Sequence, residues 1–117
     1  MRPDPRPPAG TALCRVEELG EIGSKAFAFG EFGNEYRLFV ARRGGQLRAY
    51  LNVCPHAHHP LDWNDNVFNR ERTRLLCGSH GAEFRFEDGV CEIGPCVGKA
   101  LTPVAIAIVE GRVVLAS

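Results

Sequence analysis

The chain has 117 residues, no formal net charge at pH 7, and 44% hydrophobic and 24% charged residues. This length fits one domain with its own core, and the lack of a basic excess argues against nucleic-acid binding. The longest uncharged apolar stretch, residues 100–109, is half of the roughly twenty residues that a membrane helix needs. Residues 1–8 lack the apolar run of a secretory signal. We therefore expect a cytoplasmic protein with reduced thiols that contacts neither nucleic acid nor membrane.

The first half of the chain begins with a proline-rich segment. Residues 1–10 hold four of the eight prolines, which predicts a disordered leader before a domain over residues 11–117. Residues 12–18 and 24–29 are candidate strands. Residues 35–52 alternate as a hairpin around Gly44-Gly45, since glycine supplies the positive φ of a tight turn.

The second half contains two more predicted hairpins. Residues 82–92 turn at Glu87-Asp88-Gly89, and residues 104–116 turn at Glu110-Gly111. Residues 70–74 are too few to assign. Short strands separated by turn signals at this spacing predict an all-β protein, an antiparallel β-sandwich or partial barrel.

Two loops carry all four histidines. The long loop over residues 52–69 contains Cys54-Pro-His56, and a short loop contains Cys77-Gly-Ser-His80, with twenty residues between His56 and Cys77. A lone Cys or His in a loop is commonly neutral, but two such pairs indicate a metal site. Thiolate and imidazole ligands suit zinc or iron–sulfur. Zinc fingers usually group two cysteines before two histidines, whereas one of each per loop suits a two-iron cluster, with both thiolates on one iron and both imidazoles on the other.

The pattern Cys-x-His, then Cys-x-x-His, resembles the Rieske [2Fe–2S] family. The likeness continues through His80-Gly-Ala-Glu-Phe and through Gly94-Pro95, which is similar to the family's proline loop. It covers about residues 36–116. The resemblance implies a Rieske-type antiparallel fold with a small cluster-binding subdomain at about residues 52–96.

The resemblance also implies the cofactor and its ligands. One [2Fe–2S] cluster per chain is expected, with Cys54 and Cys77 on one iron and His56 and His80 on the other. In such a site neutral imidazoles replace two thiolates, and the reduction potential rises to about −150 to +300 mV.

Four positions bear on where in that range the potential lies. High-potential family members link the two cluster loops by a disulfide and place a Ser and a Tyr to hydrogen-bond the sulfurs. Here His59 and Ser79 stand at the disulfide positions, and Ala82 and Phe84 stand at the hydroxyl positions. The resemblance therefore implies a low potential, in the lower half of the range.

Cys91 and Cys96 lie on either side of Gly94-Pro95. Two interpretations stay open: a redox-active pair near the cluster, or two packed and reduced thiols.

By resemblance, the favoured function is that of a soluble, low-potential Rieske-type ferredoxin without substrate chemistry of its own. A flavin reductase would be its donor, and a ring-hydroxylating oxygenase or a related reductase system its acceptor. The oxygenase itself is disfavoured, because its mononuclear iron needs two further histidines and a carboxylate. The alternatives are the small redox subunit of a nitrite-reductase-like complex and a zinc-stabilised β interaction module.

Overall fold

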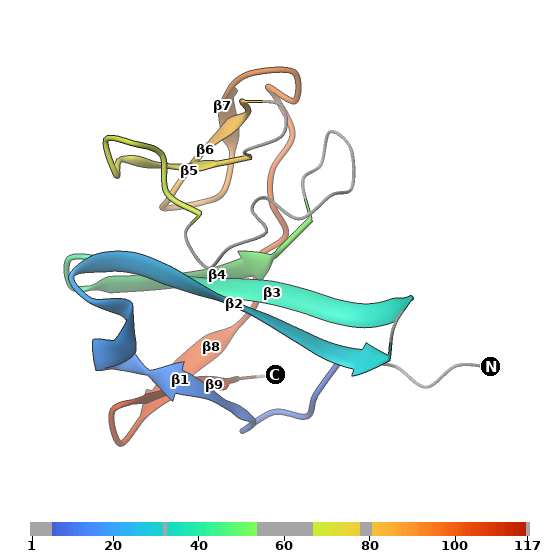
Figure 1. The fold of residues 1–117 in the computed structure, drawn as a ribbon, viewed down its shortest axis with the longest axis vertical. Coiled ribbons are helices and arrows are strands. Elements are labelled where there is room, and N and C mark those ends of the chain that lie inside the picture. Colours follow the sequence, from blue (N-terminus) through green and yellow to red (C-terminus); the bar gives the residue numbers. More distant parts are fainter. Residues whose placement is uncertain (1–5, 32, 54–66, 78–80, 117) are drawn as a thin grey trace.

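The computed structural model describes residues 6–31, 33–53, 67–77 and 81–116 (Figure 1). In this part of the chain, the secondary structure is almost entirely antiparallel β, arranged in three three-stranded sheets without a closed barrel, which confirms the predicted fold class. The sheets have the orders β1-β9-β8, β2-β3-β4 and β5-β6-β7. The elements are β1 (Ala12–Arg15), the 3-10 turn η1 (Val16–Leu19), β2 (Ile22–Glu31), β3 (Asn34–Arg43), β4 (Gln46–Leu51), β5 (Arg74–Leu76), β6 (Glu83–Arg85), β7 (Cys91–Ile93), β8 (Ile106–Val109) and β9 (Arg112–Leu115).

The three predicted hairpins are present. Strands β3 and β4 turn at Gly44 and Gly45, β6 and β7 are joined through Gly89, and β8 and β9 turn at Glu110 and Gly111. Both residues of the last turn have positive φ, 51° and 77°. A two-residue turn with this geometry follows the right-handed twist of the strands that it joins.

The N-terminal strands differ from the prediction in their bounds. The candidate strand 12–18 ends at Arg15, because the Arg15 N–H donates to the Glu18 carboxylate (2.6 Å) and the chain bends into η1. This bond and the one from the Lys25 ammonium lower the pKa of Glu18. The second strand, β2, begins at Ile22 and is longer than expected.

Two apolar cores lie on opposite faces of the β2–β4 sheet, which separates the small β5–β7 sheet from the β1-β9-β8 sheet (Figure 1). Strand β3 supplies both cores, since Phe39 and Ala41 face one and Leu38 and Val40 face the other. All four side chains are fully buried. The first core, toward β5–β7, contains Phe39, Ala41, Tyr50, Val67, Phe68, Leu75, Cys77, Ala82, Phe84, Phe86, Cys91, Cys96 and Leu101. The second core contains Cys14, Leu19, Leu38, Val40, Ala49, Val104, Val113 and Leu115.

The chain ahead of β1 contacts the C-terminal strand. The Gly10 N–H donates to the carbonyl of Leu115 (2.7 Å), and the Thr11 hydroxyl donates to the carbonyl of Pro8 (2.7 Å). Among the residues described, no helix has the length and apolarity to span a membrane.

Candidate functional site

Of the four expected ligands, Cys77 is the one whose surroundings are described. Cys54, His56 and His80 lie outside the described residues, as do His59 and Ser79. Taken alone, the described residues bring no three metal-ligating side chains together. The described part of the candidate site consists of Cys77 and the segments around it.

Cys77 directly follows β5, at the tip of the β5–β6 hairpin. Its N–H donates to the Ala82 carbonyl (2.8 Å), and its carbonyl accepts from the Gly81 N–H (2.9 Å). Gly81 has a φ of 72°, which glycine adopts without strain. The two bonds tie the Cys77 backbone to Gly81 and Ala82, and the Cys77 side chain is fully buried in the first core.

The proline loop, residues 94–98, packs against the same hairpin. A Cβ on Gly94 would lie 2.7 Å from the Ala82 Cα. Gly94 also has a φ of 103°. Only glycine allows both this backbone conformation and this close approach, so Gly94 lets the proline loop pack against Ala82.

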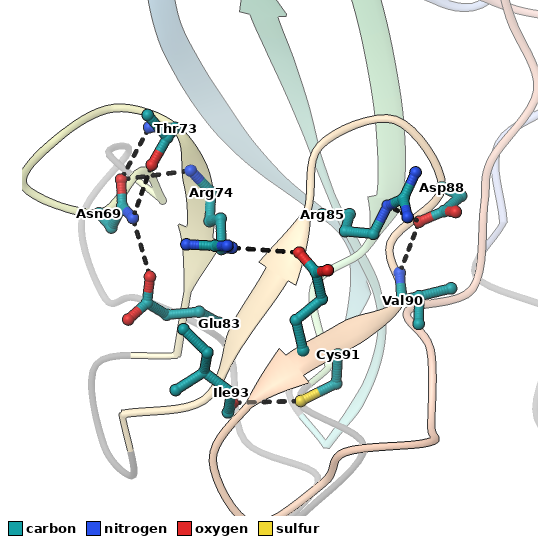
Figure 2. A network of polar contacts seen from close by, with 10 residues as sticks. Asn69, Thr73, Arg74, Glu83, Arg85, Asp88, Val90, Cys91 and Ile93 are labelled. Carbon is teal, nitrogen blue, oxygen red and sulfur yellow. Dashed lines mark hydrogen bonds and ion pairs between the residues drawn. The ribbon is translucent and has the colours of Figure 1, made fainter.

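A buried asparagine that sequence analysis missed orders the turn before β5 (Figure 2). The Asn69 Oδ1 accepts from the N–H groups of Thr73 (2.9 Å) and Arg74 (3.2 Å). Its Nδ2 donates to the Glu83 carboxylate (2.8 Å) and to the Thr73 hydroxyl (3.2 Å). Asn69 thus ties the turn, in which Arg72 has a φ of 60°, to strand β6.

An ion pair extends this network across the small sheet. The Arg74 Nε lies 3.1 Å from the Glu92 Oε1, and so joins β5 to β7 across β6. Both side chains are more than a third exposed, so the pair adds little to stability.

Tyr50 connects the β2–β4 sheet to the small sheet. Its hydroxyl donates to the Phe86 carbonyl (2.7 Å), and its side chain is 2% exposed. Burial raises the pKa of Tyr50 to about 12. A Cβ on Gly89 would lie 2.8 Å from the Tyr50 ring, so the β6–β7 turn also sits directly on this side chain.

The two ends of the long loop are anchored. The Asn52 N–H donates to the Arg37 carbonyl (2.9 Å). At the other end, the Val67 N–H donates to the Ser24 hydroxyl (2.9 Å), and the Val67 carbonyl accepts from Leu76 (2.7 Å). The residue preceding Cys77 is therefore paired with the far end of the segment that carries Cys54 and His56.

The donor chemistry of the described residues fits a cluster with thiolate ligands. Cys77 has no exposed surface, and none of the described cysteines forms a disulfide. The thiolate is the form of cysteine that binds metal. Side-chain nitrogen and oxygen atoms that are buried in the described part of the chain all have hydrogen-bond partners.

Comparison with known proteins gives one family match. A family model described as the Rieske [2Fe-2S] domain matches residues 11–110. No curated protein matches the chain.

Several solved structures share the fold. The ferredoxin of carbazole 1,9a-dioxygenase from Nocardioides aromaticivorans IC177 has 23% identity and a TM-score of 0.65, with 92% of this chain and 98% of that chain covered. The Sphingomonas yanoikuyae B1 ferredoxin has 21% identity and a TM-score of 0.68, with 91% and 96% covered. A structure described as a complex of reduced oxygenase and oxidized ferredoxin in carbazole 1,9a-dioxygenase has 22% identity and a TM-score of 0.68, with 90% of each chain covered.

Proposed function

The chain belongs to the Rieske [2Fe–2S] domain family, and from this premise we propose that it is a cytoplasmic ferredoxin that carries electrons to an oxygenase. The family match over residues 11–110 carries this proposal. The cofactor of the family is a [2Fe–2S] cluster, which takes up and releases one electron when it is bound. The chain's own residues then have to hold the cluster, set its potential and present it to other proteins.

The proposed ligands are Cys54 and Cys77 for one iron and His56 and His80 for the other. Cys77 supports this assignment, because it is buried at a hairpin tip whose ends are clamped by backbone hydrogen bonds. The two thiolates balance the charge of the oxidised two-iron, two-sulfide core, while neutral imidazoles add none. An electron is accepted more easily by a neutral site than by the doubly negative site that four thiolates would give.

The two imidazoles would also couple protons to electrons. When one ring nitrogen of His56 or His80 ligates metal, the other ring nitrogen can hold or release a proton. Reduction of the site favours the protonated ring, so the potential of such a site falls as the pH rises through the pKa of the imidazoles.

The proposed donor is a flavin reductase and the proposed acceptor is a ring-hydroxylating oxygenase. Support for the acceptor comes from the relatives: two are described as a ferredoxin of, or in complex with, an oxygenase of the carbazole 1,9a-dioxygenase system. We propose that the chain performs no substrate chemistry of its own.

Spectroscopy of the purified protein tests the cofactor. The protein should be red-brown, contain iron and sulfide in equal amounts, and give an EPR signal after reduction by dithionite. Colourless protein with one zinc per chain would overturn the proposal in favour of a zinc-stabilised interaction module.

A pair of cysteine variants tests the ligand assignment. Cys77→Ser should abolish the visible absorption. Cys14→Ser is the matched control, because Cys14 is also buried but belongs to the second core. Retained absorption in Cys77→Ser, or equal loss in both variants, would contradict the role of Cys77 as a ligand.

Stopped-flow mixing tests the direction of electron flow. Reduced flavin reductase should bleach the oxidised protein, and an oxidised Rieske oxygenase should then restore its colour. Failure to reduce any such oxygenase, together with rapid reduction of a nitrite reductase, would favour the reductase-subunit alternative.

A further inference from the structure

We propose that Cys91 and Cys96 are a modification site, at which a hydroperoxide converts two thiols into a reversible disulfide. The two Sγ atoms lie 3.0 Å apart. The Cys91 Sγ also lies 3.3 Å from the carbonyl oxygen of Ile93, a contact that Figure 2 shows. A disulfide bond is about 2.05 Å long, so the sulfurs need to approach by only about 1 Å. The function proposed above does not depend on this pair, and the pair does not depend on it.

The backbone already holds the two cysteines together. Cys91 begins β7, and Cys96 lies in the turn after Gly94-Pro95. The Cys91 N–H donates to the Lys99 carbonyl (2.9 Å), and the Lys99 N–H donates to the Cys96 carbonyl (2.9 Å). These bonds hold the backbone of both cysteines in place through Lys99, so little conformational entropy remains to be lost when the two sulfurs form a disulfide.

The burial of the pair determines which oxidants can react with it. Cys91 is 2% exposed and Cys96 is 1% exposed. The residues between and after them are exposed, including Val97 at 62%. Both cysteines belong to the first core, so an oxidant reaches them only when the segment that carries them opens locally. Such an opening would admit a small neutral oxidant far more readily than a bulky disulfide reagent.

Hydrogen peroxide can oxidise the two thiols to a disulfide in two steps. The sulfur of one cysteine, after losing its proton, attacks the peroxide O–O bond, which breaks to give a sulfenic acid and water. The second sulfur attacks the sulfenic sulfur, the S–S bond forms, and a second water leaves with the remaining proton. Two electrons pass from the thiols to the peroxide, and a dithiol reductant reverses the change by exchange.

The disulfide would fasten the proline loop to β7. Gly94, which lies within this loop, is packed against Ala82. Oxidation of the pair would therefore restrain the loop that packs against Ala82.

Peptide mapping of the peroxide-treated holoprotein tests the proposal. Trypsin releases Cys91 and Cys96 together in the peptide 86–99, separately from Cys14, Cys54 and Cys77. After peroxide treatment and alkylation of the unfolded protein, this peptide should be unalkylated and lighter by two hydrogen atoms than its reduced form. Dithiothreitol treatment should restore two alkylatable thiols.

Two variants serve as controls. Cys14→Ala removes a buried cysteine of the second core, and the 86–99 disulfide should form as in the unmodified chain. Cys96→Ser should leave Cys91 alkylated or over-oxidised. If peroxide leaves both thiols of the unmodified chain alkylatable, or oxidises each separately to sulfinic acid, the proposal is wrong.

Equilibrium with dithiothreitol buffers separates the effect of the fold from simple proximity in sequence. The holoprotein and a synthetic peptide of residues 86–99 are brought to equilibrium in the same buffers. The pair in the folded protein should become half-oxidised in a buffer at least about tenfold more reducing than the peptide requires, a ratio that corresponds to about 1.4 kcal/mol. If the protein becomes half-oxidised only in a buffer that is as oxidising as the one the peptide needs, or more oxidising, the proposal is wrong.

Discussion

Gly94 is the residue at which the proline loop meets the hairpin tip. We predict that Gly94→Ala destabilises the holoprotein by about 1–3 kcal/mol for its positive φ, and by about 1–3 kcal/mol more for crowding against Ala82. The crowding is expected because the new Cβ would lie 2.7 Å from the Ala82 Cα. Urea unfolding of the holoprotein measures the sum.

Gly98 provides the matched control for Gly94. Its φ is 95°, close to that of Gly94, but a Cβ there would have no atom within 4 Å. Gly98→Ala should therefore show the cost of backbone strain alone. Equal loss of stability in the two variants would mean that the contact between the proline loop and Ala82 is unimportant.

Tyr50 gives a pH-dependent prediction. The native state keeps the tyrosine proton up to a pKa of about 12, whereas the unfolded chain releases it near pH 10. Between these values the unfolded chain binds fewer protons than the native protein, so the free energy of unfolding falls as the pH rises. The fall should approach about 1.4 kcal/mol per pH unit within that window.

Tyr50→Phe removes both the titration and a buried hydrogen bond. At neutral pH it should lower the free energy of unfolding by about 1–3 kcal/mol, because the Phe86 carbonyl loses its donor. Above about pH 10 the variant should lose less stability per pH unit than the unmodified chain does. Urea titrations at a series of pH values compare the two, with Tyr36→Phe as a control at a half-buried tyrosine. Parallel curves for Tyr50→Phe and the unmodified chain would contradict the prediction.

Ala82 and Phe84 carry the prediction of a low reduction potential. Both side chains are fully buried directly after the hairpin tip, and neither can donate a hydrogen bond to a cluster sulfur. We expect a midpoint in the lower half of about −150 to +300 mV. Ala82→Ser and Phe84→Tyr should each raise it, because donors to the sulfurs stabilise the reduced cluster.

A redox titration monitored by visible absorption measures these midpoints. Phe86→Tyr is the control, because Phe86 belongs to the same core but is not one of the two motif positions. A midpoint above about +200 mV for the unmodified chain would show that hydroxyl donors at these positions do not determine the potential.

At the scale of elements, the turn before β5 depends on Asn69. Asn69→Ala removes two acceptor contacts within the turn and the donor to Glu83. We expect a loss of about 1–3 kcal/mol in the free energy of unfolding, measured by urea titration, since Asn69 is buried and its partners would lose their bonds.

A pair of exchanged side chains tests the geometry of that contact. Asn69→Asp keeps the acceptor for the turn but places a carboxylate against Glu83, so it should also destabilise. In the double variant with Glu83→Gln, the glutamine amide donates and the introduced aspartate carboxylate accepts, the reverse of the native bond. This variant should recover most of the free energy of unfolding that Asn69→Asp loses. If the double variant is no more stable than Asn69→Asp, the Asn69–Glu83 bond does not hold the turn to β6.

Turn chemistry explains which elements the sequence predicted. The hairpins around Gly44-Gly45, Gly89 and Gly111 were correct because glycine marks each reversal between alternating residues. Strand β5 was missed, because three residues show no period, and the turn before it depends on Asn69, whose partner Glu83 is distant in sequence. The run of four buried residues in β3 reflects two cores, one on each face, which local alternation does not reveal.

The candidate site was predictable where side-chain chemistry alone identifies it. The spacing of the Cys/His pairs predicted the family, and the match over residues 11–110 confirms it. The four ligands stay a prediction. The contact between Cys91 and Cys96 depends on how the proline loop folds back on β7, so the sequence left two interpretations open, and the structure gives the distance between their sulfurs.

At the scale of the whole molecule, the two cores differ in what supports them. The second core lies between the two larger sheets, β2–β4 and β1-β9-β8. The first core is closed on one side by β5–β7, whose strands have three residues each. Strands this short gain little stability by themselves. We therefore expect the small sheet to depend on the metal cluster held at the tip of its hairpin.

Removal of iron by a chelator under reducing conditions tests this dependence. Amide hydrogen exchange should become at least about tenfold faster in β5, β6 and β7, while β3 and β9 keep their protection, because local opening exposes only the first core. Cys77→Ser should give the same pattern without chelator. Equal loss of protection in β3, β9 and the small sheet would show that the two cores unfold as one unit. Unchanged exchange in the small sheet would show that the frame around Cys77 is stable without its cofactor.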